Sequence, residues 1–431
     1  MESKIGWVDL SPLQRDRVKK FMDLMGMGGV QDELGVGIIR DAMSNRIFPG
    51  FSTLYTRAKY FFITPYLLLD RDSNKQDKKQ SGIDYFKKAE IGANKIIIDF
   101  YESHPDRMDE SYFGKENKNG VLKRQPSEIY WNGILTLHLI ESITSLDQLL
   151  LDKHSTMEEL LATNRGDDTA KEQGENKGYC PTTVSYSKDW KEEIKAQGLT
   201  LSLTEAETLR DRLRGYTKDS LPAELVTNTN IWEIYKAAEV EYKKSEMIDN
   251  PFVWFAKHAY QLVSSDDLRK NLIAAQNLSL FLYGPHIAYN IRLWENAKAS
   301  DSFILGKRSE GISWLQNLKG RMIDYDGFNI NDCMTNANIK EPTRRFLNNV
   351  QTLISKSDNW MDVENELCDL AEQQERWNKK AKSRFIKLEN ERVIDEMKKK
   401  QWLGLGLINY RYTATLSVMK DIYEGLDNTV G

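Results

Sequence analysis

Side chains able to hold a phosphate follow the tripeptide Phe48–Gly50, in the stretch FPGFSTLYTRAKYFF. These hydroxyl and basic residues are Ser52, Thr53, Thr56, Arg57 and Lys59. The tripeptide breaks the preceding helical pattern, and Ser52 is the predicted N-cap of a new helix that runs toward Pro65. A helix start exposes free N–H groups and the positive end of the helix dipole, which suit phosphate oxygens. The pattern therefore predicts a phosphate-backbone or nucleotide contact, completed by Arg57.

The same stretch also fits a purely structural interpretation. Ser52 could be an ordinary cap, and Arg57 could pair with an acidic residue upstream, at Asp32, Glu33 or Asp41. On the expected helix, Arg57 and Lys59 lie toward solvent. The side chains expected to pack on that helix are Leu54, Ala58 and Phe61.

A second candidate is the stretch VLKRQPSEIYWNG, which begins at Val121. Lys123 and Arg124 precede a helix start that we place at Ser127, and two aromatic residues, Tyr130 and Trp131, follow. Basic residues beside aromatic ones can track and stack on a nucleic-acid strand. In the alternative interpretation, the aromatic residues belong to the core and the basic pair lies in a solvated loop.

A third candidate is the basic run RWNKKAKSRFIKLENERVIDEMKKK, residues 376–400. It holds ten Lys or Arg against four Asp or Glu. On a continuous helix, one face would carry a stripe about 17 Å long, at 1.5 Å per residue. The stripe consists of Arg376, Lys380, Arg384 and Lys387. It could neutralise several phosphates and give salt-dependent binding, although most charge runs are merely solvated faces.

The fourth candidate is Arg411, which lies between two tyrosines just before a C-terminal helical pattern. It could contact a ligand or act as a structural clamp, and the sequence favours the clamp.

Enzymatic chemistry is harder to assemble from this sequence. The five histidines show no metal-binding spacing, and no Walker or dinucleotide motif is present. Two acidic groups could hold a cation for a metal-dependent nuclease: Asp32 with Glu33 and Asp41, or the loop from His104 to Glu110. Such loops are usually solvated surface. We predict no cofactor and no metal, and we favour a protein that is not an enzyme.

The composition describes a globular protein with a sizeable core. The chain has 431 residues, 40% hydrophobic and 29% charged, with a net charge of −4. Its three cysteines form no CxxC pair, so we expect a reducing, cytoplasmic setting. We expect no signal peptide, and the longest apolar stretch, 272–294, carries too many polar residues for a membrane span. In that stretch, His286 fits a hydrogen-bonded core histidine.

Hydrophobic periodicity predicts a mostly α, multi-helix fold of two lobes, with at most a small β-hairpin. The first predicted helix is capped at Ser11, and another begins with a capping box of Thr204 and Glu207. The hairpin would lie near 116–124, and an extended stretch is possible at 198–204. Further helices are expected at 83–103, 127–142, 145–153, 156–163, 221–227, 230–247, 252–264, 267–298, 311–323, 342–356, 359–399 and 412–425.

A polar segment divides the chain into the two predicted lobes. Residues 164–183 contain hardly any large apolar side chain, which is typical of a linker. We therefore predict an N-terminal helical domain at 1–163, a linker or insertion at 164–195, and a C-terminal helical domain at 196–431.

Several of these segments, taken in order, resemble a bacterial family of unknown function. The resemblance depends on IGWVDLS, DELGVGIIRDA, FPGFSTLYTRAKYFFITPY, PSEIYWNGI, LTEAETLRDRL, LFLYGPHIAYNIRLWE, RWNKKAKSRF and NYRYTATLSVMKDIYEGL. It implies a cytoplasmic, mainly helical bacterial protein. Relatives lie in gene neighbourhoods with helicases, phospholipase D-type nucleases or DNA modification genes, which implies a role in phage defence or in mobile elements. The family implies no catalytic residues, and the segment 164–195 departs from its pattern.

The leading hypothesis is a non-catalytic component of a bacterial anti-phage defence system. It would bind DNA, or a helicase or nuclease from the same operon, and no membrane. The basic residues proposed for this contact are Arg57, Lys59, Lys123, Arg124, Lys380 and Arg384. One alternative is an assembly scaffold in which these residues form ion pairs, and another is an enzyme with an unrecognised carboxylate site.

Overall fold

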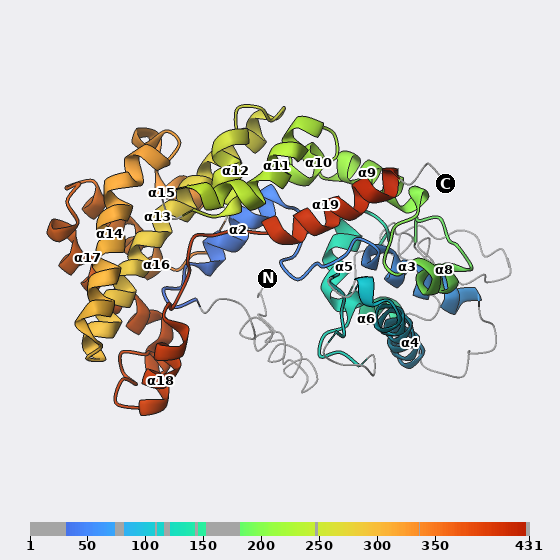
Figure 1. Cartoon of the computed structure of the whole chain (residues 1–431), viewed down its shortest axis with the longest axis horizontal. Helices are drawn as coiled ribbons and strands as arrows, with labels where there is room; N and C mark the ends of the chain where they lie inside the picture. Colours follow the sequence, from blue (N-terminus) through green and yellow to red (C-terminus); the bar gives the residue numbers. More distant parts are fainter. Residues whose placement is uncertain are drawn as a thin grey trace, which may run out of the picture. The chain divides into compact units, whose positions relative to one another are not determined.

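The described part of the chain is helical. The computed structural model describes residues 32–73, 82–107, 110–115, 121–142, 145–151, 182–245, 249–335 and 337–427. Over these ranges helices follow one another and no strand is present, apart from an isolated antiparallel bridge between Ile140 and Thr182 (Figure 1). The predicted mostly α, multi-helix fold is confirmed.

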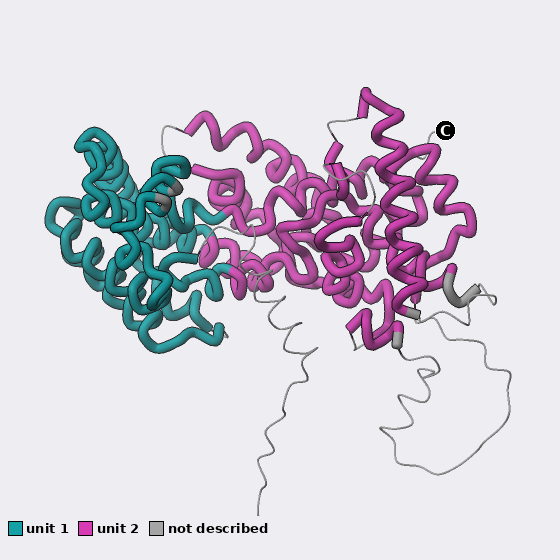
Figure 2. Tube along the Cα trace, turned by 90° about the horizontal axis from the view of Figure 1, so that it is seen from below, with its two compact units in different colours: residues 1–40, 276–408 teal, residues 41–275, 409–431 magenta. Residues whose placement is uncertain are grey.

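The chain forms two compact units (Figure 2). Unit 1 comprises residues 1–40 and 276–408, and unit 2 comprises residues 41–275 and 409–431. The division falls within two helices, α2 (Gly37–Ile47) and α13 (Asp266–Asn296). The predicted linker at 164–195 lies mostly outside the described residues.

Unit 1 is built from helices that pack through tryptophans seated on glycines. Besides parts of α2 and α13, its α-helices are α14 (Asp301–Arg321), α15 (Ile330–Cys333), α16 (Glu341–Ile354), α17 (Trp360–Lys379) and α18 (Glu391–Lys400). A Cβ on Gly284 would lie 2.2 Å from the Trp314 ring, and one on Gly311 would lie 2.6 Å from the Trp360 ring. The absent side chains therefore let α14 approach both α13 and α17. Short 3-10 helices occur at η4 (Tyr325–Gly327) and η5 (Lys380–Lys382).

Unit 2 surrounds a core rich in aromatic side chains. Its α-helices are α3 (Tyr60–Ser73), α4 (Gly82–Ser103), α5 (Pro126–Thr136), α6 (Leu146–Leu151), α8 (Trp190–Gln197), α9 (Leu203–Tyr216), α10 (Leu221–Leu225), α11 (Thr229–Glu241), α12 (Pro251–Ala259) and α19 (Tyr412–Asp427). The 3-10 helices η2 (Pro105–Arg107) and η3 (Tyr242–Lys244) complete it. Tyr130 of α5 stacks on Tyr55 at 4.1 Å between ring centres and meets Phe61 edge-on at 5.0 Å.

The DELGVG stretch forms a structural corner in unit 1. The Asp32 carboxylate accepts the N–H groups of Val36 at 2.8 Å and Gly37 at 2.9 Å, so it caps the start of α2. Gly35 has φ +72°, a conformation that favours glycine. The Asn378 side chain of α17 donates to the carbonyls of Asp32 and Glu33. Side-chain hydrogen bonds therefore hold this corner on α17.

The predicted helix start at Ser52 is wrong. Residues 51–59 form turns, and α3 begins at Tyr60 and continues past Pro65. The loop is fixed by tertiary contacts, because the Thr56 N–H donates to the hydroxyl of Tyr130 in α5 at 2.9 Å. Local capping chemistry is therefore outweighed by the aromatic core beneath the loop.

Other helix boundaries also differ from the sequence predictions. The helix expected at 359–399 breaks at Lys380, which has φ +51°, and the capping box of α9 is Ser202 with Glu205. Since α9 begins at Leu203, the extended stretch expected at 198–204 is also wrong. The first predicted helix, the helix at 156–163 and most of the hairpin lie outside the described residues. None of the described helices combines the length and the apolar character that crossing a membrane requires.

A Gly133→Ala substitution should destabilise unit 2. Its Cβ would lie 2.4 Å from the Tyr55 hydroxyl and 2.6 Å from the Gly50 carbonyl oxygen, so the core must shift. We expect a loss of about 1–3 kcal/mol and a lower Tm in thermal unfolding. The matched control is Gly92→Ala in α4, where a Cβ meets nothing within 4 Å. It should be neutral or stabilising by up to about 1 kcal/mol. Equal Tm values for the two variants would contradict the packing argument.

Candidate functional site

The proposed phosphate grip does not lie at a helix start. The Ser52 hydroxyl accepts the N–H of Leu54 at 3.2 Å, which is a local turn contact. Thr53 is exposed and Thr56 is half-buried in the same loop. Leu54, expected to pack, is 43% exposed, whereas Ala58 and Phe61 are fully buried as expected.

Arg57, expected to face solvent, is buried in an ion-pair cluster of unit 2. Its Nε donates to both carboxylate oxygens of Asp421, at 2.8 and 3.0 Å. Its Nη1 donates to Glu110 and to the Tyr101 hydroxyl. Asp421 also accepts the N–H of Ala58 at 2.6 Å. The structural interpretation therefore predicts the role of Arg57 correctly but its acidic partners wrongly. The actual partners, Asp421 and Glu110, lie far from Arg57 in the sequence.

Lys59 is also buried, with only 1% of its surface exposed. Its Nζ lies 2.7 Å from the Glu205 carboxylate, which accepts the Tyr66 hydroxyl at 2.9 Å as well. Glu205 is also the capping residue that accepts the Ser202 N–H at the start of α9. Lys59 therefore links the loop before α3 to the start of α9.

The second candidate separates into an exposed and a buried part. Lys123 is exposed and Arg124 half-buried, as their loop alternative expects. Tyr130 is fully buried and its hydroxyl donates to the Arg57 carbonyl at 2.9 Å, whereas Trp131 is half-buried. Tyr130 therefore belongs to the core, as the alternative interpretation expects, whereas Trp131 is only partly buried.

Ser127 is not the N-cap of α5, which begins one residue earlier at Pro126. Its N–H and its hydroxyl instead donate to the Glu90 carboxylate of α4, at 2.8 and 2.9 Å. Burial raises the pKa of Glu90 from an ordinary value of 4.5 to about 7, against the opposing effect of these two hydrogen bonds. A carboxyl group from another helix thus takes the place of a local cap.

The basic stripe expected on residues 376–387 does not exist as one helix face, because α17 ends at Lys379. Arg376 is exposed and pairs with Glu372 at 2.8 Å, one turn earlier. Arg384 is buried, with its Nε 3.1 Å from Glu33 and its N–H donating to Glu375 at 2.8 Å. Arg384 therefore belongs to the unit 1 interior.

Exposed lysines remain on the segment that follows α17. They are Lys380, Lys382, Lys387, Lys398 and Lys399. Within the described ranges none of these five takes part in an ion pair. Sequence reasoning selected two of them and missed the other three, although the charge run was visible. This lysine segment, residues 380–399, is the most basic exposed stretch among the candidates.

Arg411 is a structural clamp in unit 2. It donates to the Phe48 carbonyl at 2.7 Å and to the Asn45 side chain at 2.6 Å. His286 is fully buried, its Nδ1 lies 2.8 Å from the Leu282 carbonyl, and burial lowers its pKa. The predicted core histidine is confirmed.

The carboxylates considered for a nuclease have structural partners. Asp32 caps α2, Glu33 pairs with Arg384, and Glu110 pairs with Arg57 and Arg107. Across the described ranges, no three His, Cys, Asp or Glu side chains lie close enough together to hold a metal ion.

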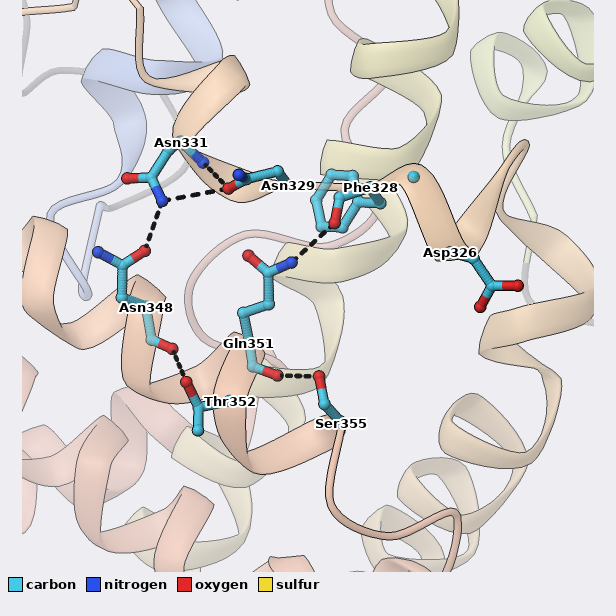
Figure 3. Close-up of a pocket in the computed structure, with 9 residues that line it drawn as sticks. Asp326, Phe328, Asn329, Asn331, Asn348, Gln351, Thr352 and Ser355 are labelled. Atoms are coloured by element: carbon cyan, nitrogen blue, oxygen red, sulfur yellow. Dashed lines mark hydrogen bonds between the residues drawn. The ribbon is translucent and has the colours of Figure 1, made fainter.

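A polar hollow of about 560 Å³ lies in unit 1 (Figure 3). It is lined by η4, α15, α16 and the residues between them, which are Asp326, Gly327, Phe328, Asn329, Asn331, Asn348, Gln351, Thr352 and Ser355. Sequence analysis missed this site, because neutral amides and hydroxyls spread over thirty positions form no recognisable motif.

These features define a helical protein of two compact units with buried ion pairs in each. The chain belongs to a family of unknown function, DUF6361, whose family model matches residues 2–394. No curated protein and no solved structure matches the chain. The predicted membership of a family of unknown function is thereby confirmed over nearly the whole chain.

Replacing Arg57 with alanine should destabilise the protein strongly, because Asp421 would be left buried and unpaired. We expect a loss of about 3–5 kcal/mol in the free energy of unfolding. Arg376→Ala removes an exposed pair and should change it by less than about 1 kcal/mol. Thermal unfolding followed by circular dichroism measures both. A wild-type Tm in Arg57→Ala would show that Arg57 has no structural role.

The buried Glu90 should make stability depend on pH. The folded-state pKa of Glu90, about 7, exceeds the ordinary value of 4.5. Its contribution to the free energy of unfolding is therefore full below pH 4.5 and is lost as pH rises through 7. Glu90→Gln does not titrate, and its Oε1 can still accept the Ser127 N–H while its Nε2 donates to the Ser127 hydroxyl. Between pH 4.5 and 8, the free energy of unfolding of this variant should rise by on the order of 3 kcal/mol relative to that of wild type.

The measurement is the Tm difference between Glu90→Gln and wild type across this pH range. Glu207→Gln serves as the control, because Glu207 is exposed on α9. Its Tm difference from wild type supplies the baseline with which the Glu90→Gln difference is compared. A constant Tm difference for Glu90→Gln would show that Glu90 ionises normally in the folded protein.

Proposed function

We propose that this protein is a non-catalytic component of a bacterial anti-phage defence system that binds DNA through the lysine segment. The observation that carries the proposal is the exposure of five lysines, none in an ion pair among the described residues, within twenty positions. Lysines of this kind can replace the counterions of a phosphate backbone, which makes binding sequence-independent and sensitive to salt.

The conformation of the segment supports this interaction. Lys380 and Lys382 belong to η5, Lys387 lies in a turn, and Lys398 and Lys399 occupy the last turn of α18. Cations in the last turn of a helix are favoured by its dipole, so these lysines do not need carboxylate partners. The segment also contains four acidic residues, which reduce the excess positive charge without cancelling it: Glu389, Glu391, Asp395 and Glu396.

The defence role is inferred from the family resemblance. Gene neighbourhoods with helicases, nucleases and DNA modification genes favour a protein that acts on DNA together with a processing partner. A cytoplasmic location follows from the same context.

An assembly scaffold without nucleic-acid contact is the second candidate. Arg57, Lys59 and Arg384 were proposed to bind DNA, and each is buried on a carboxylate. Three of the six basic residues proposed to contact DNA therefore stabilise the fold instead, as the scaffold alternative expects. The two candidates differ in whether the lysine segment binds DNA.

Fluorescence anisotropy with labelled single- and double-stranded DNA across a salt series tests the proposal. The variant Lys380→Gln/Lys382→Gln/Lys387→Gln keeps side-chain length and removes three charges. If all three contact phosphates, the slope of log K against log salt should fall by about 2.7 for duplex DNA. The matched control is Lys188→Gln/Lys218→Gln/Lys243→Gln, which removes three exposed lysines of unit 2.

Binding that is lost in the segment variant and retained in the control supports DNA contact at this segment. Equal losses in both variants would place binding elsewhere or make it nonspecific. If wild type does not bind at low salt, the DNA proposal fails for the isolated protein. Copurification with the proteins of neighbouring genes would then test the scaffold.

A further inference from the structure

The polar hollow of unit 1 plays no part in the proposed DNA contact, and its side chains are arranged as a set. At about 560 Å³ it has the volume of a small-molecule site. Asn329 and Asn331 come from the start of α15, whereas Asn348, Gln351 and Thr352 come from α16 (Figure 3). Two helices therefore present neutral polar groups to one space.

Hydrogen bonds fix the orientation of the amides. Gln351 accepts the Ile330 N–H at 3.0 Å and donates to the Phe328 carbonyl at 2.8 Å. The Asn331 amide nitrogen donates to the Oδ1 atoms of Asn329 and Asn348, both at 3.1 Å (Figure 3). Since these bonds assign nitrogen and oxygen on each amide, the groups that remain unused are known.

The unused groups include both donors and acceptors. Nδ2 of Asn329 and Nδ2 of Asn348 remain as donors, and Oδ1 of Asn331 remains as an acceptor, with no hydrogen-bond partner in the described structure. The Thr352 hydroxyl donates to the Asn348 carbonyl at 2.9 Å, so its lone pairs can still accept. The Ser355 hydroxyl donates to the Gln351 carbonyl in the same way. A fitting ligand must therefore both accept and donate hydrogen bonds.

Charge and apolar surface narrow the choice of ligand. Asp326 contributes a carboxylate, and no basic side chain is among the nine lining residues, which disfavours a phosphate-bearing ligand. Half-exposed Phe328 packs against Phe281 on one side, at 5.4 Å between ring centres. Its remaining surface offers an apolar contact beside the polar groups.

We propose that this hollow binds a neutral saccharide of one or two units. Sugar hydroxyls can donate to Thr352 and Asn331 while accepting from the two free asparagine donors. The apolar C–H face of a pyranose ring fits against Phe328. The inference is independent of DNA binding, because it rests on different residues.

Saturation-transfer difference NMR on the full chain tests the assignment. The probes are glucose, galactose, N-acetylglucosamine, maltose and cellobiose at millimolar concentration, with adenosine and cytidine in a separate sample. Asn348→Ala removes one unused donor and should weaken saccharide binding at least tenfold. Asn349→Ala changes the exposed neighbour outside the hollow, and should bind as wild type does.

A saccharide signal that is lost in Asn348→Ala and kept in Asn349→Ala supports the site, provided that both variants melt like wild type. If Asn348→Ala does not fold, Thr352→Val takes its place as the test variant. The assignment is overturned if no saccharide gives a signal, if both variants bind equally, or if the nucleosides bind and the saccharides do not.

Discussion

The burial of Arg57 is the constraint on which unit 2 depends. A guanidinium removed from water needs carboxylates with good geometry, or the charge destabilises the fold by several kcal/mol. Asp421 and Glu110 provide them, although 364 positions separate Arg57 from Asp421 along the chain. The C-terminal helix α19 therefore helps to hold the loop ahead of α3 in its observed conformation. Lys59 forms a second buried ion pair, with Glu205, which connects the same loop to the start of α9. Two cations separated by one residue in the sequence thus contact three distant segments.

Unit 1 uses the same kind of interaction at a different corner. Glu33, in the DELG stretch, is buried beside Arg384, and Lys379 lies 3.3 Å from its carboxylate. Glu375 accepts the N–H of Arg384 and the hydroxyl of Ser383. The break between α17 and the lysine segment therefore coincides with a charged cluster that holds the N-terminal corner. In both units, basic residues that the sequence suggests are available for binding instead form buried ion pairs that stabilise the fold.

Local patterns were sufficient to predict most of the helices but not the role of their charges. The helices α4, α13 and α16 follow from hydrophobic periodicity, and their observed bounds lie within a few residues of the predicted ones. The break at Lys380 could not be predicted, because it depends on a positive φ angle stabilised by contacts outside the local sequence. The same reason explains Arg57: its acidic neighbours in sequence were the natural partners to propose, whereas the actual partners are set by the tertiary fold.

Several segments that carry the family resemblance supply residues of these buried ion pairs and hydrogen bonds. DELGVG forms the corner on α17, TRAK supplies Arg57 and Lys59, and PSEIY supplies Ser127 and Tyr130 to the interior. Membership of the family therefore reports primarily on the fold. Residues committed to ion pairs in the core cannot also meet a partner without unfolding part of the unit. Any binding function must consequently lie on groups that the fold leaves unused, such as the lysine segment and the amides of the polar hollow. The family segment RWNKKAKSRF contains both kinds of residue, because Arg384 is buried beside Glu33 whereas Lys380 and Lys382 are exposed.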